Sequence, residues 1–221
     1  MTGDRGYPKI TVIIVMTVTH TDYPPKEKRN HAMPYAILRF QKRKAGGVAA
    51  CERHNERKKE AYKSNPDIDV GRSKDNYHLV KPPRYTYKKE INQMVKEAGC
   101  KVRKDSVMMV ETLITASPEF MNSLPPEEQK AYFQTALDFI SERVGKKNIL
   151  SAVVHMDERT PHMHLCFVPL TPDNKLSAKS ILGNQKSLSE WQTAYHERMS
   201  ARWGELERGQ SSMETKRKHI P

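Results

Sequence analysis

The sequence predicts an α+β fold in which helices flank an antiparallel sheet. Two apolar runs, 149–154 and 165–170, require burial, and the polar turn between them is typical of a β-hairpin. From residue 125 to residue 145, a Pro-Pro-Glu-Glu start precedes apolar side chains at helical spacing. The chain has 221 residues, of which 37% are hydrophobic, and this is enough for one main domain.

Strands and helices are expected to alternate along the chain. Gly99 and Gly145 each follow a helical pattern, and glycine is the residue type that most often ends a helix. Turn residues at 171–174 separate the last strand from the last helix. The expected strands are 35–40, 77–80, 107–114, 148–156 and 162–169, and the expected helices are 46–62, 86–98, 125–144 and 187–203.

Residues 1–32 are expected to be an N-terminal extension of unknown role that precedes a main domain over 33–221. The stretch 23–31 is rich in proline and charge, which is typical of a linker. An additional strand over 10–18 is the alternative. The chain stops shortly after a basic run at 216–219.

The cysteines and the hydropathy indicate a cytoplasmic protein. Cys51, Cys100 and Cys166 lie far apart and are odd in number, so they predict neither a disulfide framework nor a Cys-x-x-Cys metal site. The longest apolar stretch, 10–18, is much shorter than the roughly 20 residues that cross a bilayer. No cleavage site of small residues follows it, so we expect neither a membrane span nor secretion.

The charge of the chain predicts a polyanionic partner. The formal net charge is +12, and the basic excess is concentrated in the segment 42–104. Tyr77, Tyr85 and Tyr87 are interleaved with these charges, a combination that suits single-stranded nucleic acid. A solvated basic surface without a partner is the alternative interpretation.

Three of the nine histidines fall within ten residues, at His155, His162 and His164. Side chains alternate along a strand, so His155 shares a face with Ser151 and Val153, and His162 shares a face with His164. If residues 156–161 turn the chain, His155 faces His162, with His164 one diagonal step away. The opposite faces would form the core, through Leu150, Ala152, Val154, Met163, Leu165 and Phe167.

Three converging imidazoles predict a metal site with open coordination positions, which is typical of a catalytic metal. The expected cofactor is a divalent ion, Mn²⁺ or Mg²⁺, with Zn²⁺ as the alternative. No His-Glu-x-x-His motif is present, which disfavours a metallopeptidase. Ordinary surface histidines on a hairpin remain the other interpretation.

Three ordered motifs resemble those of one family. The stretch 155–164 resembles the metal motif of HUH endonucleases of the MobV relaxase group, also called Mob/Pre plasmid mobilisation or recombination proteins. Residues 53–57 resemble the first motif of that family and residues 76–79 its second, and residues 33–47 resemble its amino terminus. The resemblance covers about 33–221, with one departure at His78, where an acidic residue is expected. It implies five strands in the sheet and, since members of the family continue beyond such a point, a domain truncated at its C-terminal end.

The resemblance implies a DNA relaxase. Such an enzyme performs metal-dependent, site- and strand-specific nicking and rejoining of plasmid DNA at the origin of transfer, for conjugative mobilisation. The family's nucleophile in the first motif maps onto His54 and implies a covalent 5′-phospho-histidine intermediate, a phosphoramidate. Plasmid DNA, single-stranded or supercoiled, is the implied partner, together with other conjugation proteins.

The residues around His54 suit this role. Ala50, His54, Arg57 and Ala61 share one face of the expected helix. Positive charge nearby disfavours imidazolium and leaves a ring nitrogen free to attack. Arg57 could stabilise charge on the phosphate, and Glu158 could hydrogen-bond His54 or a metal ligand. Arg53, Lys58, Asn76 and Tyr77 complete the expected set as DNA contacts.

Other functions remain open at this point. A rolling-circle replication initiator of the same fold would share the metal site. A basic DNA-binding module would use His54 as one phosphate contact without catalysis, and a nonspecific metal-dependent nuclease would leave no persistent adduct. Tyr77 is the alternative nucleophile, although base stacking suits it better.

Overall fold

The computed structural model describes residues 34–59, 62 and 65–209, so the interpretations of residues 1–32, the strand over 10–18 and the basic run at 216–219 lie outside it. The strands are β1 (Tyr35–Lys44), β2 (Tyr77–Val80), β3 (Val107–Ala116), β4 (Ile149–His155), β5 (His162–Phe167) and β6 (Glu207–Arg208). The α-helices are α1 (Ala45–Asn55), α2 (Tyr87–Glu97), α3 (Pro118–Ser123), α4 (Pro126–Val144), α5 (Ala178–Leu182) and α6 (Gln185–Ser200), with two 3₁₀ turns at Val70–Asp75 and Lys146–Asn148.

The strands form one sheet in the order β2-β4-β5-β3-β1-β6, so the α+β prediction is confirmed. All neighbouring pairs are antiparallel except β1 and β6. The described sheet has six strands rather than five, because a two-residue β6 adds to the edge beside β1. The hairpin of β4 and β5 lies inside the sheet, between β2 and β3.

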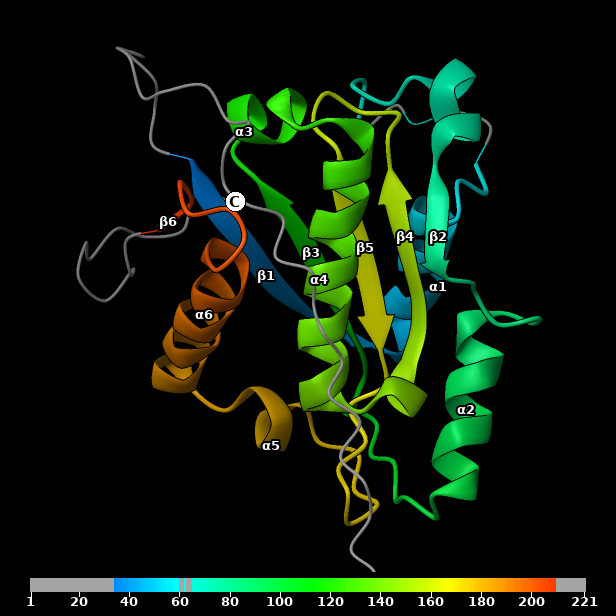
Figure 1. The fold of residues 1–221 in the computed structure, drawn as a ribbon. Coiled ribbons are helices and arrows are strands. Elements are labelled where there is room, and N and C mark those ends of the chain that lie inside the picture. The colour runs from blue at the N-terminus through cyan, green and yellow to red at the C-terminus, as the bar shows by residue number, and fades with distance from the viewer. Residues whose placement is uncertain (1–33, 60–61, 63–64, 210–221) are drawn as a thin grey trace, which may run out of the picture. The chain divides into compact units, whose positions relative to one another are not determined.

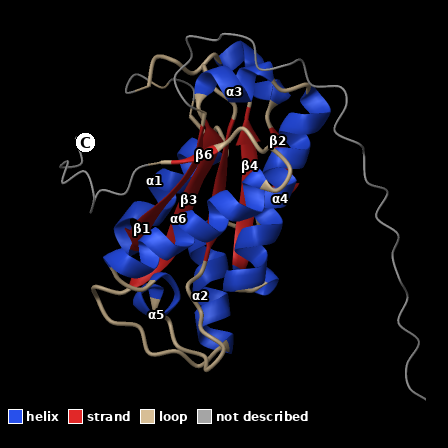
Figure 2. Cartoon of the chain, turned by 60° about the vertical axis from the view of Figure 1, so that its left-hand side comes forward, coloured by secondary structure: helices blue, strands red, loops and turns tan. Residues whose placement is uncertain are grey.

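Helices cover the two faces of the sheet differently. In Figure 1, α4 and α6 lie in front of the sheet, whereas α1 lies behind it. The main core forms on the α4 side, where Tyr132, Phe133 and Ile140 of α4 are fully buried. A second cluster packs α1 and α2 against the other face, around Tyr87 and Ile91. Figure 2 shows the same sheet between these helices from the side.

The first helix is shorter than predicted. It ends at Asn55 rather than at residue 62, and Arg57 adopts a positive φ of 48°, which is unfavourable for a residue with a Cβ. The Arg57 side chain forms ion pairs with the hairpin turn, and these tertiary contacts outweigh the local helical preference. Ala61, expected on the same helical face, lies outside the described residues.

The register of β4 differs from the prediction at one core residue. Ala152, Val154, Met163, Leu165 and Phe167 belong to the main core, as predicted, but Leu150 packs in the second cluster with α2. A bulge between Ile149 and Ser151 shifts the alternation at this point. The short helices α3 and α5 were not predicted.

Within the described ranges, no helix combines the length and the apolar character that crossing a bilayer requires.

Candidate metal centre

The hairpin brings the three predicted histidines together. His155 lies directly opposite His162 in the register of β4 and β5, as the alternation predicts. The ring centroids are 5.2 Å apart for His155 and His162, 4.9 Å for His155 and His164, and 5.0 Å for His162 and His164. His155 is completely buried and His164 is buried, so the cluster lies within the protein rather than on its surface.

Each imidazole uses one nitrogen as a donor within the protein and leaves the other free. His155 Nε2 donates to the Asn55 carbonyl at 2.8 Å, and His162 Nδ1 donates to the Thr160 carbonyl at 2.9 Å. His164 Nδ1 donates to a carboxylate oxygen of Glu111 at 3.0 Å. Because these acceptors accept only, His155 Nδ1 and the Nε2 atoms of His162 and His164 are the atoms that can bind an ion.

Two of these nitrogens are buried without a hydrogen-bond partner, namely His155 Nδ1 and His164 Nε2. Buried polar atoms are rarely left unsatisfied in native proteins, so these two lone pairs fit a metal ion. Burial and the neighbouring His164 lower the pKa of His155 to about 2, which keeps its ring in the neutral, ligating form. The residues therefore fit the divalent cation that the sequence predicts.

The potential ligands form two overlapping groups. The donor atoms of His54, His155 and His164 lie within 4.8 Å of one another, and so do those of His155, Glu158 and His162. The predicted trio is thus divided between two groups that share His155. His54 and Glu158 are close enough to take part in the same centre.

His54 stands near the end of α1 with its ring directed toward this cluster. Its centroid is 5.2 Å from that of His164 and 5.7 Å from that of His155. Burial, His164 and Arg57 lower the pKa of His54 to about 4, so the ring is neutral near pH 7. The half-buried ring has no hydrogen-bond partner within the described part of the chain, and its nitrogens remain available.

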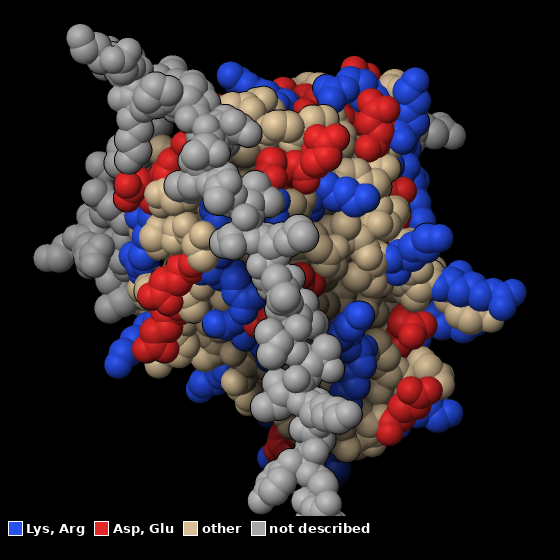
Figure 3. Space-filling view, in the orientation of Figure 1, with Lys and Arg blue, Asp and Glu red and all other residues tan. Residues whose placement is uncertain are grey.

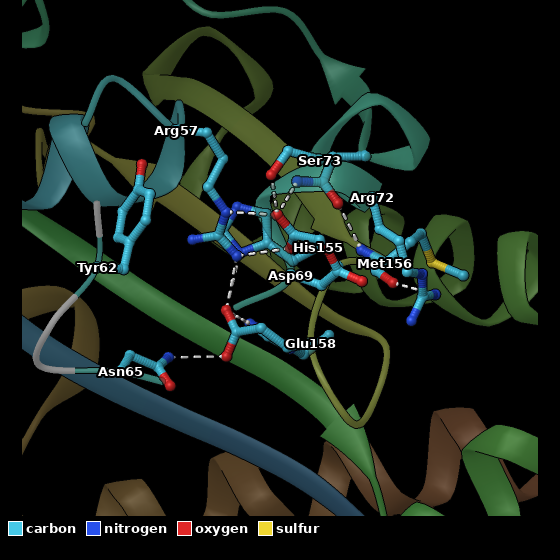
Figure 4. A network of polar contacts seen from close by, with 12 residues as sticks. Arg57, Tyr62, Asn65, Asp69, Arg72, Ser73, His155, Met156 and Glu158 are labelled. Carbon is cyan, nitrogen blue, oxygen red and sulfur yellow. Dashed lines mark hydrogen bonds and ion pairs between the residues drawn. The ribbon is translucent and has the colours of Figure 1, made fainter. Parts of the chain in front are cut away.

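Arg57 ties the end of α1 to the turn of the hairpin. Its Nε and Nη2 atoms donate to both carboxylate oxygens of Asp157, at 2.8 and 2.7 Å. Nη2 also donates to Glu158 Oε1 at 2.6 Å, and Nη1 donates to the His54 carbonyl at 3.1 Å. Figure 4 shows the Arg57 guanidinium next to the carboxylate of Glu158, and the ring of Tyr62 lies on its other side. Arg57 therefore holds Glu158 in place beside the histidines.

Asp157 is the buried centre of this network, with no exposed surface. Besides Arg57, it accepts hydrogen bonds from Ser73 Oγ at 2.6 Å and from Asn76 Nδ2 at 2.9 Å. Asn76 Oδ1 accepts from the backbone N–H of Met156 at 2.7 Å. The sequence analysis expects Asn76 at the DNA, but the structure directs its side chain to the protein interior.

The carboxylate of Glu158 faces the metal donors. Its Oε1 atom lies 3.6 Å from His162 Nε2 and 3.8 Å from His155 Nδ1, and its Oε2 atom accepts from Asn65 Nδ2 at 3.0 Å. Burial alone would raise the pKa of Glu158, but His162 and Arg57 outweigh it and keep the carboxyl ionised. Glu158 is expected to contact either His54 or a metal ligand. In the structure it lies beside the candidate ligands His155 and His162 and forms no hydrogen bond with His54.

The other predicted DNA contacts are dispersed. Arg53 is exposed on α1, and Lys58 forms an ion pair with Glu52 at 2.7 Å. Tyr77 pairs with Val154 and packs on the α4 side of the sheet, away from the histidines. Burial raises the pKa of its hydroxyl to about 12.

Only one of the three interleaved tyrosines is exposed. Tyr87 is 1% exposed, and its hydroxyl donates to Glu56, which also contacts His78, the departure from the family pattern. Tyr85 is 55% exposed, with Lys89 Nζ 3.7 Å from its ring centroid. Of the three tyrosines that are interleaved with basic residues, only Tyr85 therefore lies on the surface.

Part of the lining of this site comes from strand residues that the sequence motifs do not indicate. A cavity of about 330 Å³ opens beside the cluster, and Leu113 and Thr115 of β3 contribute to it. The complete lining consists of His54, Asn65, Leu113, Thr115, Glu158, Thr160, His162 and His164. The period-two alternation of residues 111, 113 and 115 is the signal that could identify this face of β3.

Glu111 is a further residue of the site that the sequence motifs do not indicate. Its carboxylate accepts from His164 Nδ1 at 3.0 Å and from Arg43 Nε at 3.0 Å, and it is 5% exposed. Burial alone would raise the pKa of Glu111, but the bonds from His164 and Arg43 hold it well below its ordinary value. An ionised carboxylate behind His164 fixes the tautomer that presents Nε2 to an ion.

Replacing Glu111 with alanine is therefore expected to weaken Mn²⁺ binding about 10- to 100-fold. The measurement is isothermal titration of the purified chain with Mn²⁺, without DNA. Glu142→Gln is the matched control, since that carboxylate is paired with Arg198 on the surface. Equal Mn²⁺ affinities for Glu111→Ala and the unmodified chain would show that Glu111 does not support the site.

Comparisons with known proteins identify the family of this chain. The family model described as plasmid recombination enzyme, Mob/Pre, matches residues 33–221. The chain is 41% identical over 187 residues to a plasmid recombination enzyme of Bacillus thuringiensis, covering 84% of this chain and 41% of that relative. It is 37% identical over 191 residues to a type 3 plasmid recombination enzyme of Mammaliicoccus lentus, covering 46% of it. The chain thus spans somewhat less than half the length of these relatives.

Solved structures give the same assignment. The chain is similar to crystal structures of the Mn-bound MobM relaxase domain (MOBV; Mob/Pre) with plasmid oriT DNA. One has 37% sequence identity and a TM-score of 0.78 and covers 85% of this chain and 95% of that domain. Another has 36% identity and a TM-score of 0.76. The chain therefore belongs to the Mob/Pre family of plasmid recombination enzymes, of the MobV type.

Proposed function

We propose that the protein nicks one strand of plasmid DNA at an origin of transfer, site-specifically, and rejoins it after conjugative mobilisation. The observation that carries this proposal is the position of His54, a neutral imidazole that lines the cavity together with His164 and lies next to the rings of His155 and His164. The similarity to a relaxase domain bound to oriT DNA supports the choice of substrate.

His54 is the nucleophile of the proposed reaction. A lone pair on its ring nitrogen attacks the scissile phosphorus, a P–N bond forms and the P–O3′ bond breaks. The electron pair of that bond leaves with O3′, which takes a proton and becomes a free 3′ hydroxyl. Rejoining is the reverse, in which a 3′ hydroxyl attacks phosphorus and releases the imidazole. The intermediate is a 5′-phospho-histidine.

His155, His162 and His164 would hold a divalent cation, which neutralises and polarises the phosphate oxygens when bound. Mn²⁺ is the first choice, since the similar MobM domain is Mn-bound, with Mg²⁺ or Zn²⁺ as alternatives. Three imidazoles leave coordination positions free for phosphate oxygens. Their other nitrogens are bound to protein acceptors, so the rings stay oriented.

Arg57 and Glu158 support the reacting groups. Arg57 fixes Glu158 beside the ligand nitrogens through their ion pair, and its guanidinium would add positive charge near a bound phosphate. Arg53 and Lys58 of the same segment would contact the DNA backbone, whereas Asn76 holds Asp157 in the interior and Tyr77 packs on the α4 side of the sheet, so neither is assigned a DNA contact. Together, these charged side chains would hold the phosphate in line with the ring nitrogen of His54.

We assign the relaxase domain to residues 33–221, with residues 1–32 as an extension. The roles of the whole protein in mobilisation, including contacts with other conjugation proteins in a bacterial cytoplasm, belong to this proposal. The unpaired thiols of Cys51, Cys100 and Cys166 agree with a reducing compartment.

The test uses supercoiled plasmid that carries a candidate transfer origin. Relaxation is expected only with a divalent cation, and an SDS-resistant adduct between protein and the 5′ end is expected to accompany it. Mass spectrometry of the DNA-linked peptide is expected to place the bond on His54. Relaxation without an adduct would indicate a nonspecific nuclease, and binding without relaxation would indicate a non-catalytic module. Cleavage of replication origins alone would indicate an initiator.

A further inference from the structure

A row of side chains leads across the sheet away from the histidine cluster. His164 of β5 lies opposite Leu113 of β3, and Leu113 lies opposite Arg39 of β1. Residues that are directly opposite in neighbouring strands point to the same face, so all three share the face of the metal site. Strands are about 4.8 Å apart, which puts the Cα atoms of Arg39 and His164 about 10 Å apart.

The helix on this face packs at the Lys44 end of β1, where Gly47 of α1 lies against Arg43, and extends over β5 and β4. Cys51 of α1 contacts Cys166 of β5, and Glu56, just beyond α1, accepts a hydrogen bond from Ser151 of β4. In Figure 1, α1 correspondingly lies behind β4 and β2. Farther from Lys44 on β1, Arg39 is exposed. This part of the face is therefore accessible beside the cavity.

The exposed strand face combines a free cation with apolar surface. Among the described residues, no carboxylate is paired with Arg39, whereas Arg43 on the same face is neutralised by Glu111. Leu113 lines the cavity and Ile37 is half-buried next to Arg39. On the opposite side of the sheet, over α4 and α6, basic and acidic side chains are mixed (Figure 3). A polyanion with apolar groups fits the β1 face better.

We propose that the face formed by Ile37, Arg39, Gln41 and Leu113, the strand track, binds the single-stranded DNA that flanks the scissile phosphate. Arg39 contacts a backbone phosphate, and Leu113 packs against a sugar or base. A stacked strand rises about 3.4 Å per nucleotide, so Arg39 meets a phosphate within about three nucleotides of the cut. The inference rests on the proposed function and adds the path of the substrate.

Salt-dependent binding tests the strand track. Fluorescent oligothymidylate is titrated with the full chain in EDTA, where no cleavage occurs, over a series of salt concentrations. Each phosphate contact to a single strand contributes about 0.7 to the slope of log K against log salt. Arg39→Ala is expected to lower this slope by about 0.7 and to weaken binding about fivefold at low salt.

Two further variants make the test specific. Arg39→Lys is expected to restore the slope, because it keeps the charge. Lys42→Ala removes an exposed cation from the same strand but from the opposite face, and we expect its slope to match that of the unmodified chain. Circular dichroism checks that all variants are folded. Equal slopes for Arg39→Ala and the unmodified chain, or equal losses for Arg39→Ala and Lys42→Ala, would overturn the strand track.

This result is independent of the test of the reaction. If the unmodified chain forms the histidine adduct but Arg39→Ala has an unchanged slope, the strand track is wrong and the nicking proposal stands. If no adduct forms but the slope falls for Arg39→Ala alone, the strand track stands as a DNA surface and the nicking proposal fails.

Discussion

Replacing His54 with alanine is expected to abolish the covalent adduct between the protein and the 5′ phosphate. The half-buried ring forms no hydrogen bond with a described residue, so its loss should leave the fold intact and single-strand binding within about threefold. No other side chain on α1 can supply a nucleophile to the cavity, as far as its described lining shows. The measurement is a denaturing gel of labelled oligonucleotide after incubation with Mn²⁺.

Tyr77→Phe is the matched control for the alternative nucleophile. Its hydroxyl belongs to a ring that packs on the α4 side of the sheet, whereas the histidines occupy the other side. We expect this variant to form the adduct normally. An adduct that persists in His54→Ala and disappears in Tyr77→Phe would assign the chemistry to the tyrosine and refute the proposed intermediate.

Replacing Asp157 with alanine is expected to lower the free energy of unfolding by about 3–5 kcal/mol. The substitution removes a completely buried carboxylate that binds Arg57 with two parallel hydrogen bonds, and it leaves the guanidinium without its main partner. Ser73 and Asn76 lose an acceptor at the same time. Urea unfolding followed by circular dichroism measures the loss.

Two variants test whether the loss of stability is specific to Asp157 or follows the removal of any acidic side chain. Asp157→Asn keeps one acceptor oxygen and should lose less stability than the alanine variant. Asp105→Ala removes a side chain that is 75% exposed and should leave the unfolding midpoint unchanged. A midpoint for Asp157→Ala that matches the unmodified chain would show that the buried ion pair does not stabilise the hairpin turn.

The metal cluster could be predicted from sequence because its geometry is local. His155 and His162 are separated by only a short turn, and alternation along two strands of one hairpin fixes which side chains meet. The strand core could be predicted for the same reason, apart from Leu150, where a bulge interrupts the alternation. Such irregularities depend on packing against a helix that a pattern of residues does not reveal.

The remaining parts of the site depend on partners far away in the chain. Glu111 meets His164 across 53 residues of sequence, and Arg57 meets Asp157 across 100. The helical pattern of residues 46–62 contains no sign that an ion pair with the hairpin ends the helix at Asn55. Asn76 likewise resembles an exposed motif residue until Asp157 is placed beside it. Sequence patterns identify candidates, but these long-range contacts decide their roles.

The carbonyl of Asn55 couples His54, the proposed nucleophile, to His155, a proposed ligand of the ion. It accepts the His155 Nε2 proton, while the Asn55 side chain is anchored to Cys51 and Cys166. His54 immediately precedes Asn55, so the reach between its ring and His155 is set by one main-chain link at a helix terminus. This spacing is therefore built into the local backbone, and it does not depend on the far wall of the cavity.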